Sequence, residues 1–131
     1  MEISYQKVTQ YMIKKSKTDP IACTNNILAL QDALEVIGGK WKLLILHYLL
    51  VRTDEINTFK KIEKDIEGIS AKMLSKELKI LEGNLLVSRE VRDTKPITVR
   101  YEITDYGKEI KSLISSLVDW GQNHRLKIIN Q

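Results

Sequence analysis

The feature that most constrains the fold is a change in the spacing of apolar residues along the chain. Up to about residue 83, apolar side chains recur every three or four positions, which is typical of helices with one buried face. Between residues 87 and 103 they recur at every second position, in two runs separated by the stretch 92–98. This alternation indicates the two strands of a β-hairpin. The chain is therefore expected to be mainly helical with one small hairpin.

Residues that start or stop helices divide the helical part of the chain. Pro20 and the glycine pair at 38–39 each end a periodic segment, because proline and glycine interrupt helices. Ser70 is a good N-cap, and Gly83 with Asn84 is a good C-terminal stop. The expected helices are 3–16, 26–37, 41–51, 59–65, 71–83 and 104–129, and the expected strands are 87–91 and 99–103.

The order of the central segments predicts a winged helix-turn-helix fold. A short helix, 59–65, a tight turn at Gly68 and a longer helix, 71–83, form a helix-turn-helix. The hairpin that follows directly adds the wing. The fold class is mainly α with a small β-hairpin wing, and 131 residues suffice for one such core. We expect an N-terminal helical extension at 1–22 and the winged domain, with its C-terminal helix, at 23–131.

The basic charge is concentrated around this motif. The net charge is +4, and residues 70–100 alone carry seven Lys or Arg against four Asp or Glu. The other 100 residues carry fourteen and thirteen. A localised basic surface on a helix-turn-helix is typical of a protein that binds nucleic acid. The expected partner is double-stranded DNA.

The helix 71–83 has an apolar face and a basic face. Leu74, Leu78 and Leu81 form the apolar stripe, which fixes the orientation of the helix. The opposite polar side chains point in one direction, as entry into a major groove requires, and the first amides can hold a phosphate. The other interpretation is a solvated lysine face, which many surface helices have. The candidate DNA contacts here are Ser70, Ala71, Lys72, Ser75, Lys76 and Lys79.

The tip of the hairpin adds two candidate DNA contacts, Arg92 and Lys95. An exposed basic tip suits contact with phosphates or with an adjacent minor groove. The alternative for Arg92 is an ion pair with Glu90 or Asp93.

The last helical segment, 104–129, is expected to begin at a capping residue, Thr104 or Asp105. It could close the monomer's core, but the preceding segments already supply enough apolar residues. Two recognition helices related by a two-fold axis would reach successive major grooves, about 34 Å apart. We therefore expect a homodimer formed through this helix and the N-terminal helix 3–16. The apolar stripe consists of Ile110, Leu113, Ile114, Leu117 and Trp120.

Other classes of function lack the residues that they need. His47 and His124 are isolated, so no metal site is expected. The sequence has no phosphate-binding glycine loop and no catalytic triad, so neither a cofactor nor enzyme activity is expected. No apolar run is long enough to span a bilayer and no signal-peptide pattern begins the chain, which predicts a cytoplasmic protein.

The single cysteine, Cys23, excludes an internal disulfide and has two interpretations. It follows Pro20 and precedes the expected helix 26–37. A free cysteine is most often a small buried apolar residue. A redox-sensing thiol has to be exposed and readily ionised, and the start of a helix favours ionisation. Both interpretations stay open at this point.

Five stretches of the chain carry motifs that occur together in one bacterial family. The run Ile-Gly-Gly-Lys-Trp-Lys-Leu-Leu-Ile-Leu, 37–46, begins fourteen residues after Cys23. A second run, Gly-Ile-Ser-Ala-Lys-Met-Leu-Ser, occupies 68–75. The others are 59–62, then 81–82 followed by 86–89, and 99–104 with Gly107. Over about residues 23–121 the chain resembles the HxlR-type family of winged-helix regulators, a branch of the MarR-like proteins.

The resemblance implies a homodimeric repressor or activator that binds an inverted repeat and reads it with the helix from Ser70. Whether a small-molecule inducer binds between the dimer helices stays open, because no set of residues in the sequence marks a ligand pocket there. It also implies that a cysteine at the position of Cys23 senses electrophiles or oxidants in some members. Three residues depart from the family pattern: Thr24 replaces the usual Pro, Thr58 a frequent Arg, and Leu85 the usual Gly after the reading helix.

The main functional hypothesis is a sequence-specific DNA-binding transcription regulator. The alternative is a winged-helix module that binds another protein without DNA, because one fold serves several functions. A protein-docking face is usually more apolar and poorer in lysine. The features that discriminate between the two are therefore the basic residues Lys72, Lys76, Lys79, Arg92 and Lys95.

Overall fold

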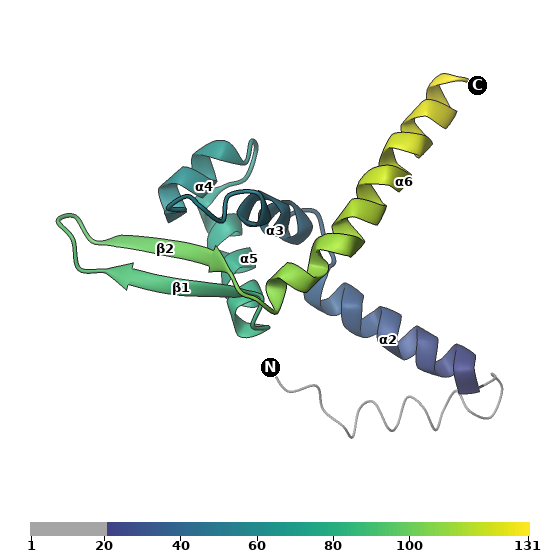
Figure 1. Ribbon diagram of the computed structural model, residues 1–131, viewed down its shortest axis with the longest axis horizontal. Helices are drawn as coiled ribbons and strands as arrows, with labels where there is room; N and C mark the ends of the chain where they lie inside the picture. Colours follow the sequence, from purple (N-terminus) through teal and green to yellow (C-terminus); the bar gives the residue numbers. More distant parts are fainter. Residues whose placement is uncertain (1–20) are drawn as a thin grey trace. The chain divides into compact units, whose positions relative to one another are not determined.

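The computed structural model describes residues 21–131 (Figure 1). They belong to two compact units, one ending at Gly39 and one spanning Lys40–Gln131. No helix among the described residues is long and apolar enough to cross a membrane. The expected helix 3–16 lies outside the described residues, and the domain boundary expected after residue 22 stays a prediction.

The described residues form helices and one hairpin. The helices are α2 (Ile21–Ile37), α3 (Lys42–Leu50), α4 (Phe59–Asp65), α5 (Ala71–Gly83), the 3₁₀ helix η1 (Gly107–Ile110) and α6 (Lys111–Ile129). The strands are β1 (Val87–Arg92) and β2 (Thr98–Ile103).

The first unit contains α2, which begins five residues earlier than expected. Cys23 therefore lies in the first turn of this helix, not before it, and our placement was wrong. Proline is favoured at the start of a helix as well as after its end, so Pro20 in the sequence suits a helix that begins beside it. The glycine pair ends α2 as expected, and Gly39 has a φ of 91°, a conformation that glycine adopts without strain.

The core of the second unit is built from α3, α4, α5 and the base of the hairpin. The helical spacing over 41–51 predicts a buried stripe of Trp41, Leu44, Ile45, Tyr48 and Leu49. This prediction is partly wrong, because Leu44 is exposed and Leu46 is buried in its place. Almost every residue of α3 is apolar, so the spacing alone did not single out its buried face. The side chains that are fully buried are Ile45, Leu46, Leu49, Ile62, Leu74, Leu78, Leu81 and Val87.

The helix-turn-helix has the expected bounds, and side-chain caps define both helix starts. The Thr58 hydroxyl accepts a hydrogen bond from the Lys61 amide at the start of α4. The Ser70 hydroxyl accepts one from the Met73 amide, at 3.1 Å, at the start of α5. Between the helices Gly68 turns the chain with a φ of 88°. The wing and this motif together confirm the expected winged helix-turn-helix fold.

The end of α5 contains an unusual residue for its conformation. The Leu86 amide donates to the Leu81 carbonyl and the Leu85 amide donates to the Glu82 carbonyl, both at 3.0 Å, which is the Schellman pattern. That pattern needs a left-handed residue after the helix, and Leu85 adopts it with a φ of 66°. Glycine normally fills this position because it has no Cβ. The departure noted at Leu85 in the sequence is therefore a site of backbone strain.

Strands β1 and β2 form the wing, an antiparallel hairpin whose register pairs Val87 with Ile103 and Arg92 with Thr98. The outer part of the hairpin extends beyond the helices of this unit (Figure 1). Its base is held by buried Val87, Tyr101 and Ile103. Near the base the Tyr101 amide donates to the Asn57 carbonyl at 2.9 Å, which ties the wing to the chain just before α4.

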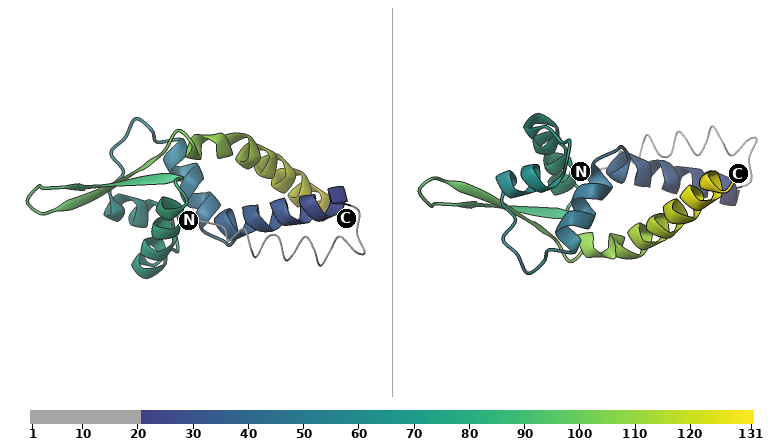
Figure 2. Two further views of the ribbon diagram at one scale, coloured as in Figure 1. Left: turned by 90° about the horizontal axis from the view of Figure 1, so that it is seen from below. Right: turned by 90° about the horizontal axis from the view of Figure 1, so that it is seen from above.

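The C-terminal helix starts at a close junction with the wing. Thr104 is the cap, since its hydroxyl accepts from the Gly107 amide at 2.8 Å and donates to the Leu85 carbonyl. A 3₁₀ turn, η1, precedes the α-helical part, which begins only at Lys111. Both views in Figure 2 show α6 leaving this junction as a single long helix. In the expected stripe only Ile114 is buried, whereas Leu113, Leu117 and Trp120 are exposed.

Candidate nucleic-acid interface

The exposed face of α5 is a row of polar and basic side chains. Lys72, Ser75, Lys76 and Lys79 are all exposed, and the leucine stripe on the other side of the helix is buried. Within the described residues 21–131, no ion pair involves any of these three lysines. The positive charge of this face is therefore available to an external anion.

The start of α5 adds backbone donors to this face. The hydroxyl of Ser70 accepts a hydrogen bond from the Met73 amide, while Ala71 and Lys72 supply the first two amides of the helix. Such amides have no carbonyl partner within the helix, and the helix dipole favours negative charge there. The position suits a phosphate oxygen.

A buried ion pair fixes α5 against α3. The Lys42 ammonium lies 2.7 Å from the Glu77 carboxylate, and the two side chains are only 12% and 8% exposed. Sequence reasoning missed this pair. The available signal was the position of Glu77, which lies on the leucine stripe between Leu74 and Leu81 and therefore needs a buried partner of opposite charge.

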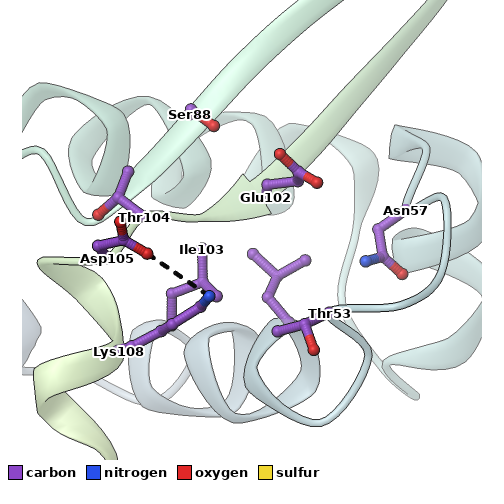
Figure 3. Close-up of a pocket in the computed structure, with 9 residues that line it drawn as sticks. Thr53, Asn57, Ser88, Glu102, Ile103, Thr104, Asp105 and Lys108 are labelled. Carbon is purple, nitrogen blue, oxygen red and sulfur yellow. Dashed lines mark ion pairs between the residues drawn. The ribbon is translucent and has the colours of Figure 1, made fainter.

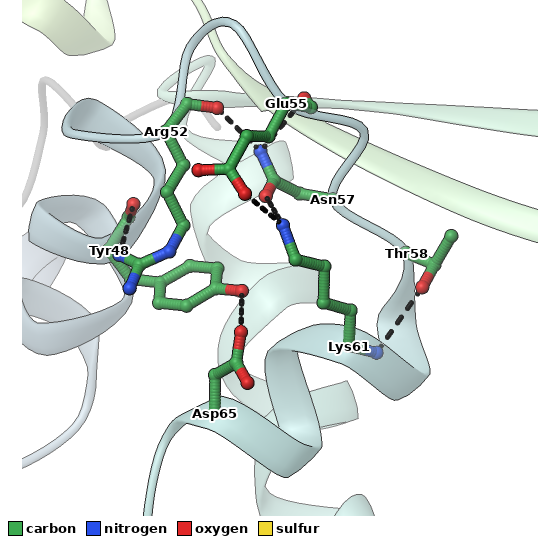
Figure 4. Close-up of polar contacts among 7 residues, drawn as sticks. All are labelled: Tyr48, Arg52, Glu55, Asn57, Thr58, Lys61 and Asp65. Atoms are coloured by element: carbon green, nitrogen blue, oxygen red, sulfur yellow. Dashed lines mark hydrogen bonds and ion pairs between the residues drawn. The ribbon is translucent and has the colours of Figure 1, made fainter.

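A second polar contact holds α4 beside α3 (Figure 4). The Tyr48 hydroxyl donates to the Asp65 carboxylate at 2.6 Å, and the Arg52 guanidinium stacks on the Tyr48 ring, 4.0 Å from its centre. Burial, followed by the hydrogen bond to Asp65, raises the pKa of Tyr48 above its ordinary value. The phenol therefore stays protonated and keeps donating at neutral pH.

The loop between α3 and α4 is fixed by the buried side chain of Asn57. Its amide group donates to the carbonyls of Arg52 and Glu55, at 3.0 and 3.3 Å. Its amide oxygen accepts from the Lys61 ammonium, which also pairs with the Glu55 carboxylate at 2.7 Å. Because the Asn57 carbonyl also bonds the wing, one residue connects the loop after α3 with α4 and β2.

The arginines of the wing are paired with one carboxylate. The Arg92 guanidinium lies 3.3 Å from Glu90, and the Arg100 guanidinium donates to the same carboxylate at 3.1 Å. The hydrogen bond from Arg100 and its charge lower the pKa of Glu90. The ion pair that was the alternative interpretation of Arg92 is therefore present. Lys95 is exposed near the tip, and its role as a DNA contact stays a prediction, like that of Arg92.

The other potentially reactive side chains of the described part of the chain lie apart from one another. Cys23 is exposed on α2. Among residues 21–131, no three His, Cys, Asp or Glu side chains are close enough to hold a metal ion. A pocket of about 270 Å³ at the base of the wing has mixed charge, and its Lys108 lies 3.6 Å from Asp105 (Figure 3).

The helix-turn-helix, its wing and the exposed basic face of α5 define the class: a winged helix-turn-helix protein that binds DNA and regulates transcription. The model of the HxlR-like helix-turn-helix family matches residues 36–128, and the chain belongs to this family. Its members are transcription regulators and not enzymes.

Several relatives share most of their length with this chain. YtcD of Bacillus subtilis, an uncharacterised HTH-type transcriptional regulator, is 34% identical over 97 residues, which cover 74% of this chain and 75% of that protein. Its crystal structure has a TM-score of 0.67 and covers 78% of this chain and 97% of that one. YodB of the same organism, an HTH-type transcriptional regulator, is 34% identical over 91 residues, 70% of this chain and 79% of that protein.

The reduced form of the redox regulator HypR has a similar structure. Its TM-score is 0.68 at 27% identity, covering 79% of this chain and 99% of that chain. Family membership thus agrees with the resemblance found in the sequence, and the DNA-binding regulator is favoured over the protein-docking module.

Proposed function

We propose that this regulator binds an inverted-repeat operator as a cytoplasmic homodimer, with α5 of each protomer in a major groove. The observation that carries the proposal is the face of α5, where three exposed lysines, which form no ion pair with residues 21–131, lie opposite a buried leucine stripe. The N-terminal residues of a recognition helix usually reach the base edges. Lys72, Ser75 and Lys76 are therefore the base-reading candidates, and Lys79 lies further along, where a phosphate contact fits.

The remaining candidates have positioning roles. The helix start at Ser70 and Ala71 suits a phosphate, and Arg92 and Lys95 on the wing suit the sugar-phosphate backbone beside the groove. Contacts of this kind fix the register of a protein on DNA without reading its sequence.

Homodimerisation through α6 and the segment 3–16 is supported by the apolar face that α6 leaves exposed. Contiguous exposed apolar side chains on a folded protein mark a surface that another molecule covers. A second copy of the chain fits, because two-fold symmetry would also duplicate α5 for an inverted repeat. The exposed apolar side chains that share one face of α6 are Leu113, Leu117, Trp120 and Ile128.

The test uses DNA that the protein itself selects from a random-sequence library. Affinity for a selected duplex and for a scrambled duplex is measured by fluorescence anisotropy over a salt series. The wild type is expected to prefer the selected duplex by at least about a thousandfold. The Lys72→Ala/Lys76→Ala variant should lose most of this preference.

The matched control for that variant is Lys111→Ala/Arg125→Ala, which removes the same charge from the side of α6 away from Leu113 and Leu117 and should keep the preference. Equal, weak binding of both duplexes by the wild type would contradict the proposal. It would favour the alternative, a winged-helix module that docks a protein.

A second candidate role, redox sensing, is supported by the exposure of Cys23 and by the similarity to HypR, which is a redox regulator. Mild oxidant should then release the wild type from its selected duplex and leave Cys23→Ser bound. Release of both proteins, or of neither, would remove Cys23 from consideration as a sensor.

A further inference from the structure

The register of the hairpin separates the wing into two faces. Side chains alternate along a strand, and residues paired across an antiparallel ladder share a face. One face carries the buried base residues, among them Tyr101 and Ile103. The other face, which we call the polar wing face, is charged or polar throughout. It consists of Ser88, Glu90 and Arg92 on β1 with Glu102, Arg100 and Thr98 opposite them on β2.

Glu90 occupies the centre of the polar wing face. It is the register partner of Arg100 and lies two positions from Arg92 on its own strand. One oxygen of its carboxylate lies 3.3 Å from Arg92 and the other lies 3.1 Å from Arg100. A single carboxylate thus engages two guanidiniums, and the three side chains together carry a net charge of +1 instead of +2.

This cluster is not what holds the hairpin together. Glu90 and Arg92 are exposed, and exposed ion pairs contribute little to the stability of a fold. The base of the hairpin is fixed by buried apolar side chains and by the bond from Tyr101 to Asn57. We therefore consider how the cluster affects the binding of DNA by the wing.

A DNA phosphate would compete with Glu90 for the same donors. Guanidiniums bind carboxylates and phosphates through the same fork of N–H groups. Each phosphate contact that a protein makes adds to its affinity and steepens the salt dependence of binding. A carboxylate that already holds two guanidiniums removes part of this gain.

We propose that Glu90 restrains the affinity of the wing for DNA by engaging Arg92 and Arg100, which would otherwise contact phosphates; this rests on the proposed function. Because phosphate contacts carry no sequence information, the restraint acts equally on every DNA sequence. Glu90 thereby lowers the affinity for operator and non-operator DNA alike and leaves sequence reading to α5.

The test compares Glu90→Gln with Glu102→Gln, using the selected and the scrambled duplex in a salt series. Both variants raise the net charge by the same amount, and both residues lie on the polar wing face. Glu102, however, has no ion pair within the described residues 21–131. Glu90→Gln is expected to bind both duplexes about tenfold more tightly at 0.1 M salt, with a slope of log K against log salt steeper by about 1–2. Glu102→Gln should change the slope by less than half of this.

A double-mutant cycle measures the effect of Arg92→Gln on DNA affinity in the wild type and in Glu90→Gln, so the test does not depend on the stability of any single variant. Arg92→Gln should weaken binding more in the Glu90→Gln background than in the wild type, because Arg92 is released only in the former. Equal effects in both backgrounds, or equal gains from Glu90→Gln and Glu102→Gln, would overturn the proposal. A wild type that does not prefer the selected duplex would instead contradict the proposed function.

Discussion

Helices α5 and α6 carry apolar stripes of similar spacing, but the stripe of α5 is buried and most of the stripe of α6 is exposed. On α5, Leu74, Leu78 and Leu81 are 0%, 1% and 0% exposed. On α6, Leu113, Leu117 and Trp120 are 39%, 45% and 65% exposed, and only Ile114 is buried. The spacing of apolar residues identifies the side chains that share a face. It does not identify what covers that face.

The difference arises from what lies beside each helix. The stripe of α5 packs against α3 and β1 within the same unit. Helix α6 contacts α3, but its side chains after Ile114 are all exposed. The comparison teaches that one stripe serves the fold of the protomer, whereas the other stripe is largely left uncovered by it.

The largest expected effect is on the covered stripe. Leu78→Ala should lower the free energy of unfolding by about 3 kcal/mol, because it leaves a cavity among fully buried side chains. Leu117→Ala, at an exposed position, should change it by less than about 0.5 kcal/mol in the dissociated chain. Urea unfolding at low protein concentration measures both. Equal losses would contradict the contrast between the two helices.

A comparable loss is expected when the buried ion pair is broken. Glu77→Gln removes the carboxylate that lies 2.7 Å from the buried Lys42 ammonium and should cost about 3 kcal/mol. The double variant Lys42→Met/Glu77→Met should recover most of this loss, because it removes both charges. Glu109→Gln, at an exposed position in η1, serves as the control and should be neutral. Thermal unfolding ranks the four proteins, and a double variant as unstable as Glu77→Gln would contradict the prediction.

An intermediate effect, with a pH signature, is expected at Tyr48. Tyr48→Phe removes the hydrogen bond to Asp65 and should cost about 1.5 kcal/mol at pH 7. The folded-state pKa of Tyr48 is raised, so its contribution is fully present below the unfolded pKa of about 10 and is lost as pH rises above it. The stability of the wild type should therefore fall more steeply than that of Tyr48→Phe above pH 10. Parallel curves in alkaline urea titrations would rule out this role for the phenol.

The smallest effect is a gain at the end of α5. Leu85→Gly should stabilise the protein by about 1 kcal/mol, because it relieves a left-handed backbone. The Leu85 side chain is 68% exposed, so little packing is lost. Leu85→Ala keeps the Cβ and the strain, and should give no gain. Chemical denaturation separates the two variants, and a stabilised alanine variant would show that the backbone is not the cause.

Local signals in the sequence were enough to predict the helix-turn-helix and the wing. The cap at Ser70, the glycine turn and the change from helical to alternating spacing each act within a few residues. The bounds of α5 and of the wing followed from them, whereas the cap of α4 at Thr58 was not predicted. Family motifs pointed to the same fold and to DNA binding, and the family comparison confirmed both.

Contacts between residues distant in sequence could not be predicted in the same way. The pairs Lys42–Glu77 and Tyr48–Asp65 join residues on different helices, and no spacing rule connects them. The two bonds of Glu90 depend on the hairpin register, which sequence suggested only approximately. The bases read by α5 and the partner of α6 depend on molecules outside the chain, and remain for the experiments above.

The close packing at Gly107 sets the direction in which α6 leaves the wing, and therefore the position of the far end of this helix. A Cβ at this position would overlap the carbonyl oxygen of Leu86 and crowd the Ile103 side chain, so a larger residue would force the start of α6 to turn. Helix α6 has 19 residues and is therefore roughly 28 Å long. A rotation of about 10° at its base would move its far end by about 5 Å. In a dimer built on α6, residue 107 would thus act as the pivot that sets how far apart two copies of α5 stand, and hence which operator spacing they fit.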